Sequence, residues 1–345
     1  MSESPLRVAI IGYGLAGRVF HAPLVSAEPG MRVAAIVTSD PGRRAAAARE
    51  HPGARLLDHA DRLWEAPGEI DLVVVAAPNR AHVPLARAAI EAGVAVVVDK
   101  PLAPDAEAGR GLVAAARDAG VMLTVFQNRR WDGDFLTVRR LLAAGEMGEP
   151  VRFESRFDRW RPVVDAGRWR ERPEAEDAGG LLADLGSHLI DQAVVLFGPP
   201  VAVHAEIGVL RPGALVDDDV FISLTHAGGV RSHLGASMLA AAPGPRMRLV
   251  GLGGTYETFG LDGQEDALRA GGRPDDTGWG LEPPATWGTL ADGASARSVP
   301  TERGDYPYFY ASVARHLRGG GPVPVDPADA VAVLEIIERA RSGSR

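Results

Sequence analysis

Three glycines near the N-terminus have the spacing of a dinucleotide-binding turn, in the segment Gly12-Tyr13-Gly14-Leu15-Ala16-Gly17. Such a turn lets the backbone approach a pyrophosphate closely, and the helix that follows directs its N-terminus at the anion. The pattern is weak evidence alone, but here it follows a short apolar run and precedes a helical stretch, as its function requires. It therefore indicates a nucleotide cofactor.

Lys100 is the only lysine of the chain, and the other 36 of its 37 lysine and arginine residues are arginines. A general replacement of surface lysine by arginine does not explain why one lysine is kept. Lys100 stands in Asp99-Lys100-Pro101, directly after an apolar run that predicts a buried strand. Ligands bind at the carboxyl ends of such strands, so this compact, titratable amine is a candidate functional group.

Asp184 and His188 lie four residues apart in a predicted helix, Gly180–Phe197, so they share a face. A carboxylate one turn from an imidazole can fix its tautomer and raise its basicity, as a general base requires. The alternative is that both residues only solvate the helix face. His188 and Asp191 also have a spacing that suits a metal, but no third ligand is evident nearby, so we expect no metal site.

Between residues 6 and 125, Val- and Ile-rich runs alternate with Ala-rich helical stretches. The runs lack polar alternation, as expected of parallel strands that are buried on both faces. We therefore predict an α/β Rossmann dinucleotide-binding domain over residues 1–125. The predicted strands are Leu6–Ile11, Met31–Val37, Leu72–Ala76, Val94–Val98 and Val121–Val125. The predicted helices are Ala16–Glu28, Arg43–Glu50, Ala60–Ala66, Ala81–Ala92 and Ala106–Ala119.

Residues 126–345 have the pattern of an α+β domain with an open, mostly antiparallel sheet. Residues 260–304 are rich in Gly, Pro and Asp and predict loops, either an ordered lid or a mobile segment. The C-terminal helix is a candidate to pack back on the first domain. The predicted strands are Val151–Trp160, Val201–Val209, Val220–Thr225, Val230–Met238, Met247–Val250 and Thr255–Phe259. The predicted helices are Phe135–Ala144, Gly180–Phe197, Tyr308–Leu317 and Pro327–Ala340.

The composition excludes several classes of function. The 345 residues are 46% hydrophobic and 24% charged, which is typical of a globular chain of about two domains. There is no cysteine, which excludes disulfides, thiolate nucleophiles and cysteine-bound zinc. A net charge of −8 argues against nucleic acid as a partner. Neither a membrane-spanning run nor a signal-peptide pattern is present, so we expect a cytoplasmic protein with a small-molecule partner.

The position after the second predicted strand usually selects the cofactor, because an acid there binds the ribose 2′-hydroxyl of NAD. Here Thr38 and Ser39 occupy this position, and Asp40, Arg43 and Arg44 follow. Hydroxyls and guanidinium groups suit a 2′-phosphate, so we expect NADP(H). NAD(H) stays the alternative, with Asp40 as the acid and both arginines as solvated residues of the first helical turn.

Taken together, the glycine turn, Pro78-Asn79 with His82, Asp99-Lys100-Pro101 and the helix with Asp184 and His188 resemble the glucose–fructose oxidoreductase / inositol dehydrogenase (Gfo/Idh/MocA) family. The resemblance covers essentially the whole chain. The family triplet is usually Glu-Lys-Pro, so Asp99 preserves the charge but changes its reach. Two further segments resemble the NADP-dependent scyllo-inositol dehydrogenase branch, namely His21-Ala22-Pro23 and Asn128-Arg129-Arg130-Trp131-Asp132.

The resemblance implies an oxidoreductase that transfers a hydride between NADP(H), or alternatively NAD(H), and a secondary hydroxyl or ketone of a cyclic polyol or sugar, such as scyllo-inositol and 2-keto-inositol. It implies Lys100, Asp184 and His188 as the catalytic residues. His188 would accept the hydroxyl proton, Lys100 would stabilise charge on the same oxygen, and Asp184 would orient the substrate or His188. The expected cofactor-binding residues are Gly12, Tyr13, Gly14, Leu15, Ala16, Gly17, Thr38, Ser39, Arg43, Ala77, Pro78, Asn79, His82, Asp99, Lys100 and Asn128.

The arginine-rich segment 152–172, with two tryptophans, predicts contacts to a polyol, although a charged surface loop is the alternative. The segment Tyr306–Tyr310 is a candidate aromatic wall, with packing as the alternative. The expected substrate-binding residues are Lys100, Arg156, Asp158, Trp169, Asp184 and His188.

Two expectations concern the protein as a whole. A sheet with one face to cover favours a homodimer or homotetramer. A dinucleotide-binding sensor or regulator without catalysis is the alternative function. A lone lysine together with Asp184 and His188 argues against that alternative, because a sensor does not need them.

Overall fold

The computed structural model describes residues 4–65, 68–165, 167 and 169–343, and the chain folds into two compact units. The first unit consists of the residues up to 128 together with 264–279 and 305–331. The second consists of 129–263, 280–304 and the residues from 332 onward. The chain thus first leaves the N-terminal unit close to the expected boundary after residue 125. It then returns to this unit twice, whereas the sequence predicts only one boundary between two continuous domains.

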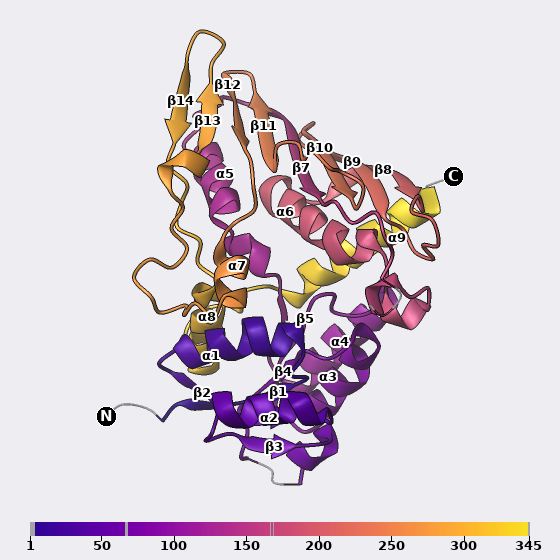
Figure 1. Cartoon of the computed structure of the whole chain (residues 1–345), viewed down its shortest axis with the longest axis vertical. Helices are drawn as coiled ribbons and strands as arrows, with labels where there is room; N and C mark the ends of the chain where they lie inside the picture. Colours follow the sequence, from indigo (N-terminus) through magenta and orange to yellow (C-terminus); the bar gives the residue numbers. More distant parts are fainter. Residues whose placement is uncertain (1–3, 66–67, 166, 168, 344–345) are drawn as a thin grey trace. The chain divides into compact units, whose positions relative to one another are not determined.

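The first unit is built on a six-stranded parallel sheet with the order β3-β2-β1-β4-β5-β6 (Figure 1). The strands are β1 (Leu6–Ile11), β2 (Met31–Val37), β3 (Arg55–Leu57), β4 (Leu72–Val75), β5 (Ala95–Asp99) and β6 (Leu123–Phe126). The five predicted strands are confirmed to within two residues. The sequence does not predict β3, because it has only three residues and its first is exposed. The Rossmann architecture is confirmed.

Helices flank this sheet as the doubly wound pattern requires. They are η1 (Ala16–His21) with α1 (Ala22–Ala27), α2 (Pro41–Glu50), η3 (Asn79–Ala81) with α3 (His82–Glu91), and α4 (Ala106–Ala119). The segment η1 is π-helical: the N–H of Ala22 donates to the Gly17 carbonyl, five residues back, and Pro23 has no N–H to offer. The helix predicted over 60–66 is instead the 3₁₀ turn η2 (Ala60–Leu63), and residue 66 lies outside the described residues.

Two late segments complete the first unit. Helix α7 (Gln264–Arg269) packs on η1, and α8 (Pro307–Leu317) packs on α1. Further along, the Thr124 hydroxyl on β6 donates to the Val325 carbonyl over 2.7 Å. Residues 260–304 are therefore not only loops: they contain α7 and also a β-hairpin of the second unit. The prediction failed there because these elements have four to six residues and few buried side chains.

The second unit has an eight-stranded sheet with the order β14-β13-β12-β11-β7-β10-β9-β8. Its strands are β7 (Pro150–Asp158), β8 (Pro200–Gly208), β9 (Asp219–His226), β10 (Arg231–Ser237), β11 (Met247–Gly251), β12 (Gly254–Thr258), β13 (Gly288–Ala291) and β14 (Ala296–Val299). All neighbours are antiparallel except β7 and β10, which are parallel. The mostly antiparallel sheet is thus confirmed.

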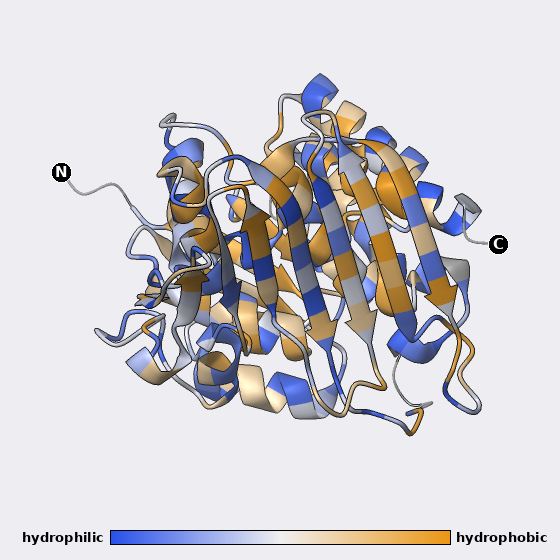
Figure 2. Cartoon of the chain, turned by 90° about the horizontal axis from the view of Figure 1, so that it is seen from above, coloured by the Kyte–Doolittle hydropathy of each residue, from blue (hydrophilic) through white to orange (hydrophobic). Residues whose placement is uncertain are grey.

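Helices cover one face of this sheet. They are α5 (Gly133–Ala143), η7 (Leu182–Gly186) with α6 (Ser187–Phe197), and the C-terminal part of α9 (Pro327–Gly343). Hydropathy alternates along the strands, so every second residue faces the helices (Figure 2). The other face is more polar than expected, because Arg152, Glu154, Arg248 and Glu257 form ion pairs across three strands. Phe221 on β9 is an exposed apolar side chain of this sheet.

Candidate active site

The glycine turn lies where β1 and β4 are neighbours, which is the point at which the strand order reverses. Gly12 has φ +97°, and a Cβ on it would lie 2.4 Å from the Ala76 carbonyl oxygen. A Cβ on Gly17 would lie 1.9 Å from the Gly12 carbonyl oxygen. Only glycine permits these close approaches, so the turn is shaped as the sequence predicts. Gly14 presents its backbone without a side chain, and this fits a cradle for a pyrophosphate.

The side chain of Tyr13 is buried and serves to hold the turn in place. Its hydroxyl donates to Glu50 over 2.7 Å, and Arg18 on η1 pairs with the same carboxylate over 2.5 Å. Glu50 ends α2, so the three side chains tie the glycine turn and η1 to that helix. Of the residues expected to bind the cofactor, Tyr13 therefore has only its backbone available for the purpose.

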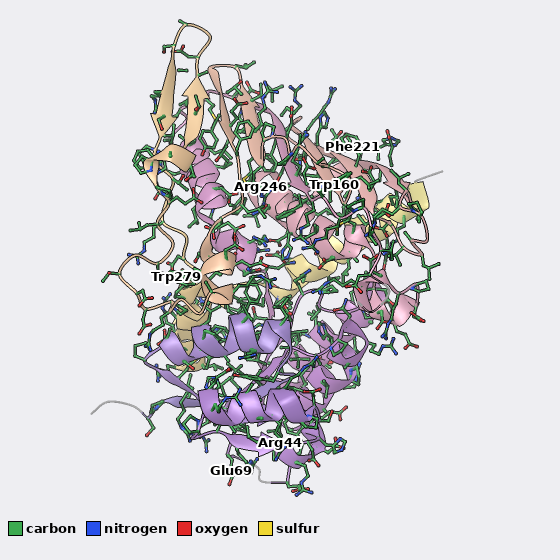
Figure 3. All side chains as sticks on the ribbon, in the orientation of Figure 1. Arg44, Glu69, Trp160, Phe221, Arg246 and Trp279 are labelled. Carbon is green, nitrogen blue, oxygen red and sulfur yellow. The ribbon has the colours of Figure 1, made fainter. Side chains whose placement is uncertain are left out.

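In the segment after β2, the side chains of Arg43 and Arg44 point to different places. The Arg43 guanidinium is the nearest side chain to Gly14, with one nitrogen 3.6 Å from where a Cβ would stand. Arg44 instead donates to the Leu56 carbonyl over 3.0 Å (Figure 3). Asp40 caps α2 by accepting the Arg43 backbone N–H over 2.7 Å. Arg43 is therefore directed at the glycine turn, whereas Arg44 is not.

The ends of β4 and β5 are joined by His82, which is 1% exposed. Its two ring nitrogens lie 2.8 Å from the Pro101 carbonyl oxygen and 2.9 Å from that of Ala77. Since carbonyl oxygens only accept, a neutral ring can donate one of these bonds and an imidazolium both. Lys100 is half-buried on this edge, and its peptide bond to Pro101 is cis. The nearby Asn79 and Asn128 are buried.

His21, the last residue of η1, is fully buried among elements that are distant in sequence. Its Nδ1 lies 2.7 Å from the Tyr310 hydroxyl on α8, and its Nε2 lies 3.9 Å from Oδ1 of Asp99. The ring of Phe126 is tilted against the imidazole at 4.4 Å. The sequence reasoning gave His21 no role of its own and did not predict its contact with Tyr310, which is 289 residues away. The alternative of aromatic packing holds for Phe309 and Tyr310, which are fully buried.

Burial lowers the pKa of His21 to about 4, and this makes a prediction about stability. The unfolded chain takes up this proton near pH 6.5, so the stability that the neutral ring contributes is complete above that pH and is lost as the pH falls toward 4. We expect wild type to lose on the order of 2 kcal/mol more stability than His21→Gln between pH 7 and 4.5. Urea unfolding at both pH values measures the difference, and identical pH slopes would contradict it.

In the second unit, Asp184 lies on η7 and His188 on the first turn of α6. Arg170 donates to Oδ1 of Asp184 over 3.1 Å. The start of η7 is fixed by Asp217, whose Oδ2 accepts the Leu182 N–H over 2.6 Å. His188 is 5% exposed, and its ring lies 6.4 Å from that of Phe157. Asp184 and His188 thus lie in the predicted helical segment, which starts with a π-helical turn.

A buried network of charged residues packs around Phe157, the aromatic neighbour of His188. The sequence reasoning did not predict this network. Arg246, which is labelled in Figure 3, donates to Ser155 over 2.5 Å and to Gln192 over 3.1 Å. Its guanidinium stacks 4.1 Å from the centre of the Phe157 ring. The network also includes two arginine–aspartate pairs, Arg130 with Asp191 and Arg129 with Asp132. The Asn128–Asp132 segment and Asp191 were noted in the sequence, but not that they would meet.

Two of the expected substrate-binding residues do not lie with His188. Arg156 and Asp158 flank Phe157 on β7, and Phe157 faces α6, so both point to the opposite face of the sheet. Asp158 there accepts the Gly244 N–H over 3.0 Å. They belong to the predicted strand Val151–Trp160, which the structure gives as Pro150–Asp158, and not to the charged loop that follows it. The side chain of Trp169 lies outside the described part of the chain.

Two kinds of feature are absent from the part of the chain that the structure describes. No group of three or more His, Asp or Glu side chains there is arranged to hold a metal ion. Among the same residues, no helix combines the length and apolar character needed to cross a membrane.

A Rossmann unit with its glycine turn at the switch point, joined to a unit with a mixed sheet and a helix bearing Asp184 and His188, defines a dinucleotide-binding oxidoreductase. Residues 6–127 match the oxidoreductase family with an NAD-binding Rossmann fold, and residues 135–257 match the GFO/IDH/MocA C-terminal domain. The chain belongs to the Gfo/Idh/MocA family of oxidoreductases.

Similar proteins cover nearly the whole chain. The oxidoreductase YdgJ of Escherichia coli is 41% identical over 98% of this chain and 96% of its own length. The scyllo-inositol 2-dehydrogenase (NADP(+)) IolW of Bacillus subtilis is 37% identical over 99% of this chain and 94% of its own length. The solved structure of the oxidoreductase YvaA from Bacillus subtilis superposes with a TM-score of 0.91 at 35% identity, covering 98% of this chain and 97% of its own.

Proposed function

We propose that this protein is an NADP(H)-dependent dehydrogenase of a cyclic polyol or sugar, which interconverts a secondary hydroxyl and the corresponding ketone. The observation that carries the proposal is the position of the single lysine, Lys100, at the carboxyl end of β5, on the same edge of the sheet as the glycine turn. The similarity to IolW, a scyllo-inositol dehydrogenase, supports scyllo-inositol and 2-keto-inositol as the first compounds to test.

In the proposed reaction each side chain has one task. A bound nicotinamide cofactor supplies or accepts the hydride. His188 takes the proton of the substrate hydroxyl, because an imidazole exchanges protons near neutral pH. Lys100 donates a hydrogen bond to the same oxygen and stabilises negative charge there. Asp184 orients the substrate or His188, and Arg170 pairs with its carboxylate over 3.1 Å.

The cofactor preference is the first prediction. Arg43 is directed at the glycine turn and the carboxylate of Asp40 is engaged as a helix cap, so we expect NADP(H) to exceed NAD(H) by at least about tenfold in kcat/KM, on the order of 1.4 kcal/mol. Thr38→Asp should shift the preference toward NAD(H), because a new carboxylate repels the 2′-phosphate. Kinetics with both cofactors measure this.

Arg44 provides a matched control for the cofactor prediction. It follows Arg43 directly, but its guanidinium donates to the Leu56 carbonyl on β3. Arg43→Gln should therefore reduce the preference for NADP(H), whereas Arg44→Gln should leave it unchanged. A wild-type protein that prefers NAD(H) would overturn the proposed role of this segment.

The substrate is tested by a screen of inositols, aldoses and their ketones with each cofactor, followed at the NAD(P)H absorbance. Turnover of 2-keto-inositol with NADPH supports the proposal most directly. Tight NADP(H) binding without turnover of any polyol or ketone would instead favour a sensor or regulator.

Quaternary structure and location belong to the same proposal. We propose a homodimer or homotetramer, supported by the uncovered sheet face of the second unit, on which Phe221 is exposed. Light scattering coupled to gel filtration tests it, and a monomer at micromolar concentration would contradict it. We propose a cytoplasmic location, which cell fractionation tests.

A further inference from the structure

The Nε2 atom of His21 is buried and has no hydrogen-bond partner among the residues that the structure describes, although Oδ1 of Asp99 lies 3.9 Å away. The other ring nitrogen, Nδ1, is within 2.7 Å of the Tyr310 hydroxyl. Burial raises the pKa of Tyr310 well above its usual value, so its phenol keeps a proton to donate. The tautomer of His21 therefore depends on whether that phenol donates to Nδ1 or accepts from it.

Electrostatics decide between the two tautomers. With the proton on Nδ1, the lone pair of Nε2 would face the Asp99 carboxylate in a water-excluded position, which is repulsive. With the proton on Nε2, Tyr310 donates to Nδ1 and the Nε2–H is directed at the carboxylate. The titratable groups around the ring are Asp99 at the end of β5, His82 on α3 and Tyr310 on α8. None of these reverses the preference, because the negatively charged Asp99 carboxylate lies 3.9 Å from Nε2.

Asp99 connects this histidine to Lys100. The same Oδ1 atom that faces His21 accepts the Lys100 backbone N–H over 2.9 Å. Asp99 is also the register partner of Phe126, whose ring packs against His21, so β5 and β6 end around the imidazole. A displacement of the Asp99 carboxylate therefore moves the backbone from which the Lys100 side chain projects.

We propose that His21 is a positioning residue for Lys100. Tyr310 fixes the imidazole with its proton on Nε2, this N–H holds the Asp99 carboxylate in place, and the carboxylate holds the backbone of Lys100. The inference rests on the proposed function in one respect, namely that Lys100 acts on the substrate. The contacts themselves do not depend on it.

The single lysine makes a direct test possible. Protein grown with lysine labelled with ¹³C at Cε gives one lysine signal, which needs no assignment because Lys100 is the only source. His21→Asn keeps a polar group near Nδ1 but removes the N–H that faces Asp99, whereas the longer amide of His21→Gln can supply that N–H. We expect the Lys100 signal to shift or broaden in His21→Asn and in Tyr310→Phe, and to stay as in wild type in His21→Gln.

His226 offers a matched control in the second unit. It is also 1% exposed, and its ring nitrogens lie 2.7 Å from the Gly198 carbonyl and 2.8 Å from the Ser232 hydroxyl. His226→Gln should lower thermal stability but leave the Lys100 signal and kcat unchanged. An unchanged Lys100 signal in His21→Asn would overturn the proposal, and so would an ¹⁵N spectrum that places the His21 proton on Nδ1.

Kinetics add a second readout. In His21→Asn we expect kcat to fall by about tenfold, because a donor displaced by a fraction of an ångström loses alignment, while KM and the Kd of NADPH change less than about threefold. His21→Gln should restore kcat to within about threefold of wild type. Equal losses in both variants would show that His21 only supports the fold. If wild type has no dehydrogenase activity, the proposed function fails, whereas the lysine signal still decides whether His21 positions Lys100.

Discussion

His188→Asn is expected to lower kcat by about 10²- to 10⁴-fold, the usual range for a positioned acid–base group, while the protein stays folded and still binds NADP(H). Asparagine is polar and smaller than histidine, so it fits the buried position on α6 beside Phe157. The variant lacks a group that can exchange a proton near neutral pH. Proton removal from the substrate hydroxyl then depends on water, which raises the barrier of the chemical step.

The pH profile separates this role from a structural one. With His188 as the base, the acid limb of the kcat profile should disappear in His188→Asn. His233 is a suitable control, because it also belongs to the second unit but lies on the face of the sheet away from α6. It stands there on β10, next to Phe221. His233→Asn should match wild type in both turnover and pH profile. A His188→Asn protein with near-normal turnover and an unchanged profile would assign His188 to packing.

Lys100→Arg is expected to lower kcat/KM by at least about 10²-fold, although arginine takes the place of lysine everywhere else in this chain. Pro101 restricts the backbone of Lys100, and Asp99 accepts its N–H, so the side chain projects from a defined point. An ammonium group is compact and can donate to one oxygen. A guanidinium is planar and forked and would crowd the space beside that oxygen.

Steady-state kinetics with a cofactor titration test the lysine. The affinity for NADP(H) should change little, because the glycine turn is untouched by the substitution. The reverse exchange at an exposed position, Arg117→Lys on α4, should leave activity unchanged and so controls for a general intolerance of the exchange. Activity of Lys100→Arg within about threefold of wild type would exclude a catalytic role for Lys100.

The sequence was sufficient to predict the bounds of strands that are formed by unbroken runs of apolar residues. Strands β1 and β2 begin and end at the predicted residues, because unbroken apolar runs are typical of strands covered on both faces. The hairpin β13–β14 was missed because most of its residues are solvent-exposed and its composition is that of a loop. Such strands owe their conformation to pairing with β12, and pairing of this kind leaves no periodic signal in the chain.

The candidate site likewise has some features that the sequence predicts and others that it does not. The glycine turn and the ends of β4 and β5 were predictable, because each is a local motif whose chemistry follows from adjacent residues. The pairing of Arg130 with Asp191, and the contact of His21 with Tyr310, join residues 61 and 289 positions apart. No local pattern encodes such contacts. Arg156 lies in a strand that the sequence predicts, but the sequence does not show which of the two alternating faces of β7 is turned toward α6.

On the ribosome, the first unit is synthesised as three separate segments of the chain. Its six strands emerge early, whereas Tyr310 and Val325, which contact His21 and Thr124, follow about 10 to 40 s later at roughly 5–20 residues per second. During that interval the imidazole of His21 and the ring of Phe126 lack the cover that α8 provides. Ribosome-bound chains that end between residues 130 and 300 should therefore be the ones that recruit chaperones most strongly.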